Sequence, residues 1–253
     1  MFVNRWSKGD LDDALSVLSE EEWECIYPWF EDAWNAGCKS AGLVLGNNAC
    51  SKENYTTAIE YWRGCGMARG WYLVGRFYNP FLDKKYQLAP SYMQDETKAR
   101  KAYEQCLRMD KNYSDALFAL SFIYMFATKD ENRNYEEAKN GFFKLLKENV
   151  NDEMYTFCFG LAGYRLLTYE FNQKWPSYKR EKLDSWKAQF DSIGVWDQNM
   201  AKEYNRYSND YADYLQSIEI YCNKFIRKAA NMGCEPAKTF ITDYDKKNST
   251  PSR

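Results

Sequence analysis

One pattern of small residues recurs along the 253-residue chain and constrains its fold more than any other feature. In its fullest copy Gly66 and Gly70 stand four residues apart, followed by Val74, Gly75 and Tyr78. Similar or more degenerate copies begin at Gly37, Asn112, Asn151 and Gly233. Two antiparallel helices joined by a tight turn need a small residue at the turn and further small residues where their backbones approach. The pattern therefore predicts a series of helical hairpins.

Helix is the expected state of nearly the whole chain, which contains only 6 Pro and few runs that alternate apolar and polar residues. A single hairpin cannot bury its apolar face, so such units stack into a solenoid. We predict an all-α fold, an α-α superhelix with a long C-terminal helix packed on it. The prediction treats residues 1–253 as one domain, with repeat-like hairpins at 20–165, an irregular helical insert at 168–222 and a terminal repeat-like hairpin at 223–246.

Several helix boundaries can be read from local signals. Residues 19–22 fit a capping box, and Ser51 and Ser114 also stand before apolar periodic segments, so we expect helices to begin at all three places. Pro80 cannot continue the helix before it, and we expect the next helix to begin near Asp95.

The segment 168–222 departs from the small-residue pattern. After Gly194, aromatic and aliphatic residues recur every three or four positions, which predicts a helix over 197–231. These residues are Tyr204, Tyr207, Tyr211, Tyr214, Ile218, Tyr221 and Phe225. We interpret this stripe as core packing; the alternative is an exposed face that forms a homodimer.

Several functional classes are disfavoured by composition. Histidine is absent, which removes the usual general base, the common metal ligand and Ser-His or Cys-His catalysis. No phosphate-binding loop of the GxxxxGK[ST] type is present, and acidic clusters stand at helix starts, where they favour the helix dipole. The formal net charge of -2 lacks the overall positive charge that is typical of proteins that bind nucleic acid, so we expect no nucleic-acid partner. We therefore expect no enzyme activity, cofactor or metal.

The eight cysteines are scattered singly, without a CxxC pair, as expected for core cysteines in a reducing compartment. Cys65 and Cys234 stand beside hairpin glycines, where buried packing and a reactive thiol are both conceivable; we expect burial. The apolar run 116–127 is too short to cross a bilayer, so we interpret it as a buried helix. The first ten residues contain no apolar stretch like that of a signal peptide, and we expect a cytoplasmic protein that does not bind membranes.

Three phrases resemble the Sel-one-like repeat family, which is close kin of the tetratricopeptide repeats. They are AWNAGCKSAGLVLG (33–46), AIEYWRGCGMARGWYLVGRFY (58–78) and RKAANMGCEPAKTFI (227–241). The resemblance spans about residues 20–165 and the C-terminal end. It implies an adaptor or scaffold whose concave surface holds a peptide or another protein.

The resemblance also implies which positions of the first helix in each repeat face the concave groove. The candidate partner-binding residues are Lys52, Tyr55, Trp62, Arg63, Lys98, Lys101, Gln105, Arg108, Asn140, Lys144 and Lys147. Lys and Arg dominate this set, so we expect the groove to attract acidic segments, with Tyr55 and Trp62 as apolar anchors. The alternative is that these long basic side chains only solvate a helix face.

We therefore predict a non-enzymatic adaptor that binds another protein. A narrower alternative is an immunity or inhibitor protein that neutralises a toxin-like partner. Two further alternatives are an enzyme that uses carboxylates, or Tyr and Lys, in a concave pocket, and self-assembly through the Tyr-striped helix 197–231.

Overall fold

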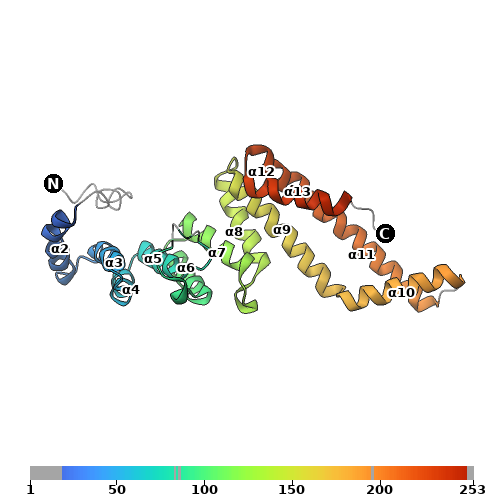
Figure 1. Cartoon of the computed structure of the whole chain (residues 1–253), viewed down its shortest axis with the longest axis horizontal. Coiled ribbons are helices and arrows are strands. Elements are labelled where there is room, and N and C mark those ends of the chain that lie inside the picture. Colours follow the sequence, from blue (N-terminus) through green and yellow to red (C-terminus); the bar gives the residue numbers. More distant parts are fainter. Residues whose placement is uncertain (1–18, 83, 85–86, 195–196, 250–253) are drawn as a thin grey trace. The chain divides into compact units, whose positions relative to one another are not determined.

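The computed structural model describes residues 19–82, 84, 87–194 and 197–249. The N-terminal segment, which bears on the signal-peptide prediction, lies outside these residues. All regular elements in the described part of the chain are helical, as the sequence predicts (Figure 1). The chain divides into two compact units, residues 1–120 and 121–253, each described separately below.

The first unit is built from helices that pack against their neighbours in chain order. Contacts join α2 to α3, α3 to α4, α4 to α5 and α5 to α6, and α7 contains residues of both units. The helices are α2 (Glu20–Asn35), α3 (Ala41–Ser51), α4 (Tyr55–Gly64), α5 (Ala68–Tyr78), η3 (Ser91–Met93), α6 (Glu96–Met109) and α7 (Ser114–Phe126). The core of this unit contains the fully buried side chains of Trp62, Phe77 and Tyr103.

The second unit is organised around α9, which packs against α8, α11, η5 and α12. Its elements are η4 (Asp130–Asn132), α8 (Tyr135–Glu148), α9 (Glu153–Lys174), α10 (Ser177–Ile193), α11 (Gln198–Tyr221), η5 (Cys222–Ile226), α12 (Arg227–Met232) and α13 (Glu235–Ser249). Phe142, Leu145 and Ile226 are fully buried in it.

The hairpin prediction is confirmed, because all five copies of the small-residue pattern begin at a turn between two helices. Those turns join α2 to α3, α4 to α5, α6 to α7, α8 to α9 and α12 to α13. Gly37 and Gly233 have φ of +90° and +112°, a left-handed conformation that favours glycine. Each closes the preceding helix with a backbone bond across six residues, from Cys38 N to Ala33 O at 2.8 Å and from Cys234 N to Ala229 O at 3.0 Å.

Glycines also lie where helices touch, as the pattern predicts. A Cβ atom on Gly70 of α5 would overlap the backbone oxygen of Trp62 on α4. A Cβ atom on Gly163 of α9 would overlap the ring of Tyr221 at the end of α11. The absence of a side chain therefore sets how closely these helices approach.

Most predicted helix boundaries are confirmed. Ser19 and Glu22 form the capping box, with Ser19 N donating to Glu22 Oε2 at 2.8 Å, and α7 begins at Ser114. The helix before Pro80 ends at Tyr78, and Asp95 caps α6 by accepting from Thr97 N at 2.9 Å.

The prediction that Ser51 begins a helix is wrong. Ser51 is the last residue of α3, and its hydroxyl donates to Asn48 O at 2.8 Å. Glu53 takes a left-handed conformation with φ of 60°, and Asn54 N donates to Ala49 O at 2.8 Å. These residues close α3 before α4 begins, so the polar run that resembles a helix start is instead a helix end.

The long helix predicted over 197–231 is confirmed. Asp197 caps α11, and the helical path continues through one π-helical segment, η5, to the end of α12. Tyr204, Tyr207 and Tyr214 pack against a core cluster of Phe171, Trp175 and Leu183. Tyr214 stacks on Phe171 with ring centroids 4.4 Å apart. This packing favours the core interpretation of the stripe.

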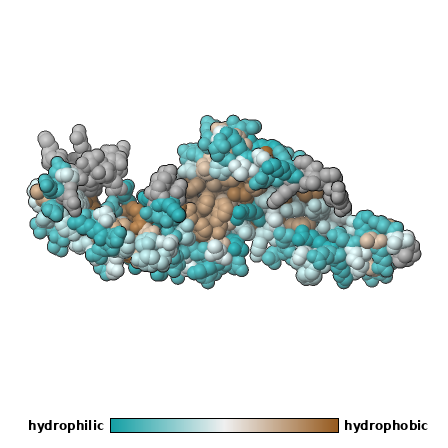
Figure 2. Space-filling model, in the orientation of Figure 1, coloured by the Kyte–Doolittle hydropathy of each residue, from teal (hydrophilic) through white to brown (hydrophobic). Residues whose placement is uncertain are grey.

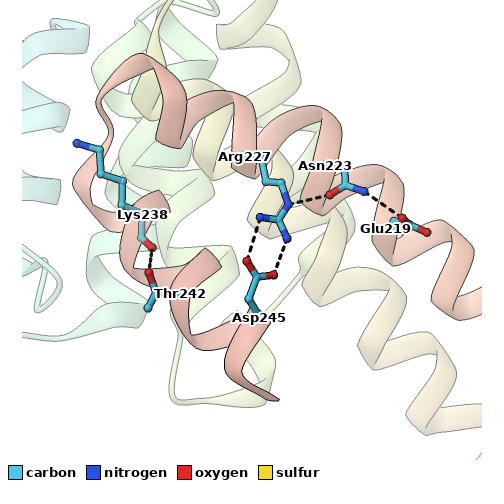
Figure 3. A network of polar contacts seen from close by, with 6 residues as sticks. All are labelled: Glu219, Asn223, Arg227, Lys238, Thr242 and Asp245. Carbon is cyan, nitrogen blue, oxygen red and sulfur yellow. Dashed lines mark hydrogen bonds and ion pairs between the residues drawn. The ribbon is translucent and has the colours of Figure 1, made fainter. Parts of the chain in front are cut away.

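Polar contacts tie α13 back to this long helix (Figure 3). Arg227 Nη1 donates to Asp245 Oδ2 at 3.1 Å, and Arg227 Nε donates to Asn223 Oδ1 at 2.9 Å. Asn223 in turn donates to Glu219 Oε1 at 3.1 Å. The guanidinium is thus held on two sides, which orients it toward the terminal helix.

The apolar run 116–127 lies mostly in α7, where Ala116, Ile123 and Met125 are buried, as predicted. Within the described ranges, no helix combines the length and apolar character that a membrane span requires. On the face drawn in Figure 2, the surface of α10 is mostly hydrophilic.

Candidate functional site

Five of the predicted groove residues line one pocket in the first unit. The pocket has a volume of about 420 Å³ and lies where α6 meets the α4/α5 hairpin. Its lining consists of Arg63, Trp71, Lys98, Arg100, Lys101, Ala102, Glu104, Gln105 and Arg108, and we call it the basic pocket. The structure therefore brings together Arg63, Lys98, Lys101, Gln105 and Arg108 from two helices separated in the chain.

Most of the lining comes from one face of α6. Lys98, Lys101, Gln105 and Arg108 follow one another at intervals of three or four residues, which places them along a single stripe. The opposite face of α6 carries the fully buried Tyr103, so the helix is anchored by its apolar side. This amphipathic division leaves the polar stripe at the surface.

Arg63 and Trp71 supply the remaining wall. Arg63 lies in the last turn of α4 and Trp71 in the first turns of α5, so the short turn between these helices brings them together. The guanidinium carbon of Arg63 is 5.7 Å from the centroid of a Trp71 ring, within the range of a cation–π contact. This contact helps to hold the Arg63 charge beside the pocket.

The pocket is strongly positive. Arg63, Lys98, Arg100, Lys101 and Arg108 contribute five formal positive charges, and Glu104 contributes the one negative charge. By contrast, α2 of the same unit contains six acidic residues and no Lys or Arg. The positive charge is thus a local feature of α4–α6 in a chain of formal net charge -2.

Glu104 organises two of these cations. Its Oε1 accepts from Arg100 Nη1 at 2.5 Å, and its Oε2 lies 3.9 Å from Arg108 Nη2. Arg108 Nη1 also donates to Gln105 Oε1 at 2.8 Å. Within the described part of the chain, the ammonium group of Lys101 has no carboxylate partner, so its charge is available to a ligand.

The placement of Trp62 in the groove is wrong. Its side chain is 1% exposed, and its Nε1 donates to Asn47 Oδ1 at 3.0 Å. Its ring fills the space left by Gly46, where a Cβ atom would overlap it. Because successive residues on a helix point in directions about 100° apart, Trp62 faces the core while Arg63 faces the pocket.

Two further predicted residues of the first unit lie away from the basic pocket. Tyr55 is half-buried, and its ring centroid is 5.4 Å from that of Phe77 in the core. Lys52 is the C-terminal cap of α3, and its amine is 5.8 Å from the centroid of the Tyr27 ring. The predicted register therefore fails at the start of α4, because residues 52–54 belong to the turn.

The remaining predicted residues belong to the second unit and lie on α8. Asn140 and Lys147 are exposed and Lys144 is half-buried. The amine of Lys147 is 4.3 Å from the centroid of the Phe143 ring. These residues do not line the basic pocket.

The sequence analysis missed four lining residues: Trp71, Arg100, Ala102 and Glu104. Arg100 and Glu104 are four residues apart, the spacing of an ion pair on one helix face, which was a usable signal. Trp71 had no such signal, because its distance from Arg63 depends on how the α4/α5 turn folds.

The thiols beside the hairpin turns are buried, which supports packing over reactivity. Cys65 is 1% exposed and Cys234 is 2% exposed. Burial raises the pKa of both thiols above the ordinary value, which disfavours the thiolate needed for reaction. Across the residues that the structure describes, no three His, Cys, Asp or Glu side chains gather in a way that could hold a metal ion.

A second, smaller pocket of about 210 Å³ lies between α9 and α11. Its lining contains one cation, Lys174, and the carboxylates of Glu170, Asp210 and Asp213. Lys174 Nζ is 2.7 Å from Asp210 Oδ2, which also accepts from Trp175 Nε1 at 2.8 Å. The hydrogen bond from Lys174 lowers the pKa of Asp210 below its usual value. This pair links the two helices. The lining groups sum to a formal charge of -2, which is smaller in magnitude than that of the basic pocket.

Comparisons of the chain with protein-family models, with curated proteins and with solved structures found no match.

Proposed function

We propose that this protein is a binding module that holds an acidic segment of a partner protein in the basic pocket. The observation that carries the proposal is the concentration of five cations around one small hollow on α4–α6, opposed by the single carboxylate of Glu104. Such a field attracts and orients an anionic partner.

The arrangement of the pocket supports binding rather than catalysis. Its polar side chains are cations, one amide and one carboxylate that is already engaged with Arg100 and Arg108. A general base or nucleophile would need an available group with a suitable pKa, such as a thiol or an unengaged carboxylate. The lining contains no such group.

Trp71 takes the role of apolar anchor that the sequence analysis gave to Trp62 and Tyr55. It is half-buried at the wall of the pocket, with Arg63 close to its ring. Trp and Arg are the residue types that most often dominate binding energy at protein interfaces. We also propose that the α4/α5 hairpin is a repeat of the Sel-one-like type, which the glycine contacts of Gly70 support.

The test is a binding measurement with defined acidic peptides. Fluorescein-labelled peptide pools with several fixed Glu and Asp residues are titrated with the full chain, and binding is followed by fluorescence anisotropy. We expect binding that weakens as salt is raised and that is lost in the variant Lys101→Glu, Arg108→Glu.

A matched control reverses two charges elsewhere. Lys202 and Lys228 are exposed on α11 and α12, so Lys202→Glu, Lys228→Glu makes the same change in net charge outside the pocket. We expect this variant to bind like the unmodified chain. If both variants lose binding equally, the loss is explained by the change in net charge, and the pocket is rejected as the binding site.

A further inference from the structure

The basic pocket carries more positive charge than one carboxylate can balance. Its lining groups sum to a formal charge of +4, from five cations and Glu104. A carboxylate brings one negative charge and two acceptor oxygens. A phosphorylated side chain brings a charge of about -1.5 to -2 at pH 7 and three strong acceptor oxygens. We infer that the pocket takes a phosphorylated side chain of a partner protein, an inference that rests on the proposed function.

Neighbouring donors of α6 are spaced to share one phosphate group, whereas the whole stripe from Lys98 to Arg108 spans about 15 Å. Lys98, Lys101, Gln105 and Arg108 stand about one helical turn apart, a rise of roughly 5 Å. Neighbouring side chains of this length converge on a single group held between them. Arg63 approaches from the end of α4, so the phosphate is contacted from two helices.

The guanidinium of Arg108 is oriented before any ligand arrives. It donates to Gln105 Oε1 at 2.8 Å and lies 3.9 Å from Glu104 Oε2. Because Gln105 uses its oxygen for this contact, its side-chain NH₂ group is left as a donor toward the pocket. A planar guanidinium held in place suits two parallel hydrogen bonds to phosphate oxygens.

The dimensions of the pocket and its exposed rim fit a segment of protein. A volume of about 420 Å³ holds a side chain and its immediate neighbours, within the usual range for ligand pockets. Lys98, Lys101 and Arg108 are exposed, so an extended chain can lie along α6 on either side of the phosphate. The backbone cradle that nucleotide sites build from glycine-rich loops is not part of the lining.

The experiment compares three fluorescein-labelled peptide pools that differ at one fixed central position: phosphoserine, Glu or Ser, each within degenerate flanking residues. The full chain is titrated into each pool at physiological salt. We expect the phosphoserine pool to bind about tenfold more tightly than the Glu pool, because it adds charge and one acceptor oxygen. The Ser pool should bind weakest.

Variants test whether the preference for phosphoserine depends on the basic pocket. Lys101→Glu, Arg108→Glu should abolish binding of the phosphoserine pool, and Lys202→Glu, Lys228→Glu should not. Arg108→Lys keeps the charge but removes the planar pair of donors. It should therefore reduce the ratio of the affinities for the phosphoserine and Glu pools, while the Glu pool still binds. Circular dichroism checks that each variant is folded.

The outcomes separate the two proposals. Equal binding of the phosphoserine and Glu pools would overturn the phosphate preference and leave the acidic-segment function standing. No binding of either pool would overturn both. Competition of the phosphoserine pool by millimolar inorganic phosphate, myo-inositol hexakisphosphate or ATP tests the source of the phosphate. If one of these binds more tightly than every peptide pool, the protein-segment inference is rejected in favour of a small phosphorylated ligand.

Discussion

Gly70 of α5 lies against the backbone of α4, and replacing it with Ala tests the packing of the α4/α5 hairpin directly. The added Cβ atom would approach Trp62 O and Cys65 Sγ to less than 3.0 Å, and Trp62 C to 3.1 Å. Atoms of the backbone and of a thiol that is 1% exposed cannot swing aside as the end of a long side chain would. The two helices would have to separate.

The expected cost follows from two opposing terms. Overpacking a dense core costs about 1 to 3 kcal/mol, and the immobile neighbours place this site at the upper end. Ala is a better helix former than Gly by about 1 kcal/mol, which offsets part of that cost. We therefore expect Gly70→Ala to lower the free energy of unfolding by about 2 kcal/mol.

The measurement is urea unfolding followed by circular dichroism, together with hydrogen exchange of peptides from residues 55–78. The matched control is Gly64→Ala at the end of α4. There the new Cβ atom would come 2.9 Å from the ring of the half-buried Trp34 and would meet no backbone atom of another helix. The control should therefore lower the free energy of unfolding by clearly less than Gly70→Ala does. If Gly70→Ala leaves stability and local exchange protection unchanged or raises them, the close-packing argument is refuted.

Two other predictions concern the buried side chain of Trp62 and the ion pair between Arg227 and Asp245. Trp62→Ala should lower the free energy of unfolding by about 3 to 5 kcal/mol, as expected of a buried aromatic; a urea midpoint equal to that of the unmodified chain would instead mean that Trp62 is a surface residue. Asp245→Asn should lower the melting temperature slightly at pH 7, because the Arg227 guanidinium holds the pKa of Asp245 below its usual value. A carboxylate with a lowered pKa stabilises the fold at pH values above its unfolded pKa of about 3.9, and this stabilisation is lost as the carboxylate is protonated in acid. The melting curves of the unmodified chain and of Asp245→Asn should therefore coincide near pH 2. A difference that persists unchanged in acid would exclude the ion pair as its source.

The helical fold was predictable because its signals are local in the chain. A glycine at a turn closes a helix through contacts with the residues just before it, as Gly37 and Gly233 do. The capping box at Ser19 and the cap at Asp95 depend on residues within one turn. The same holds for the regular spacing of aromatic residues that predicts the helix continuing from α11 to α12.

The candidate site was only partly predictable, because it depends on the helical register and on how separate helices meet. The stripe of Lys98, Lys101, Gln105 and Arg108 follows from spacing within α6 once that helix begins at the Asp95 cap. The predicted groove positions before and on α4 were misjudged, because residues 52–54 close α3 and because Trp62 belongs to the buried apolar face of α4, with Ala58 and Ile59.

By itself, the sequence determined that this chain forms paired helices with glycines at their turns and contacts, and that histidine chemistry is absent. Those properties depend on residue type and near neighbours alone. The tertiary structure decided which face of α4 is buried, that Trp71 and Arg63 meet across a turn, and that five cations surround one hollow. A contact between distant residues depends on the angle and separation of the helices that carry them, and those are set by the packing of the whole core.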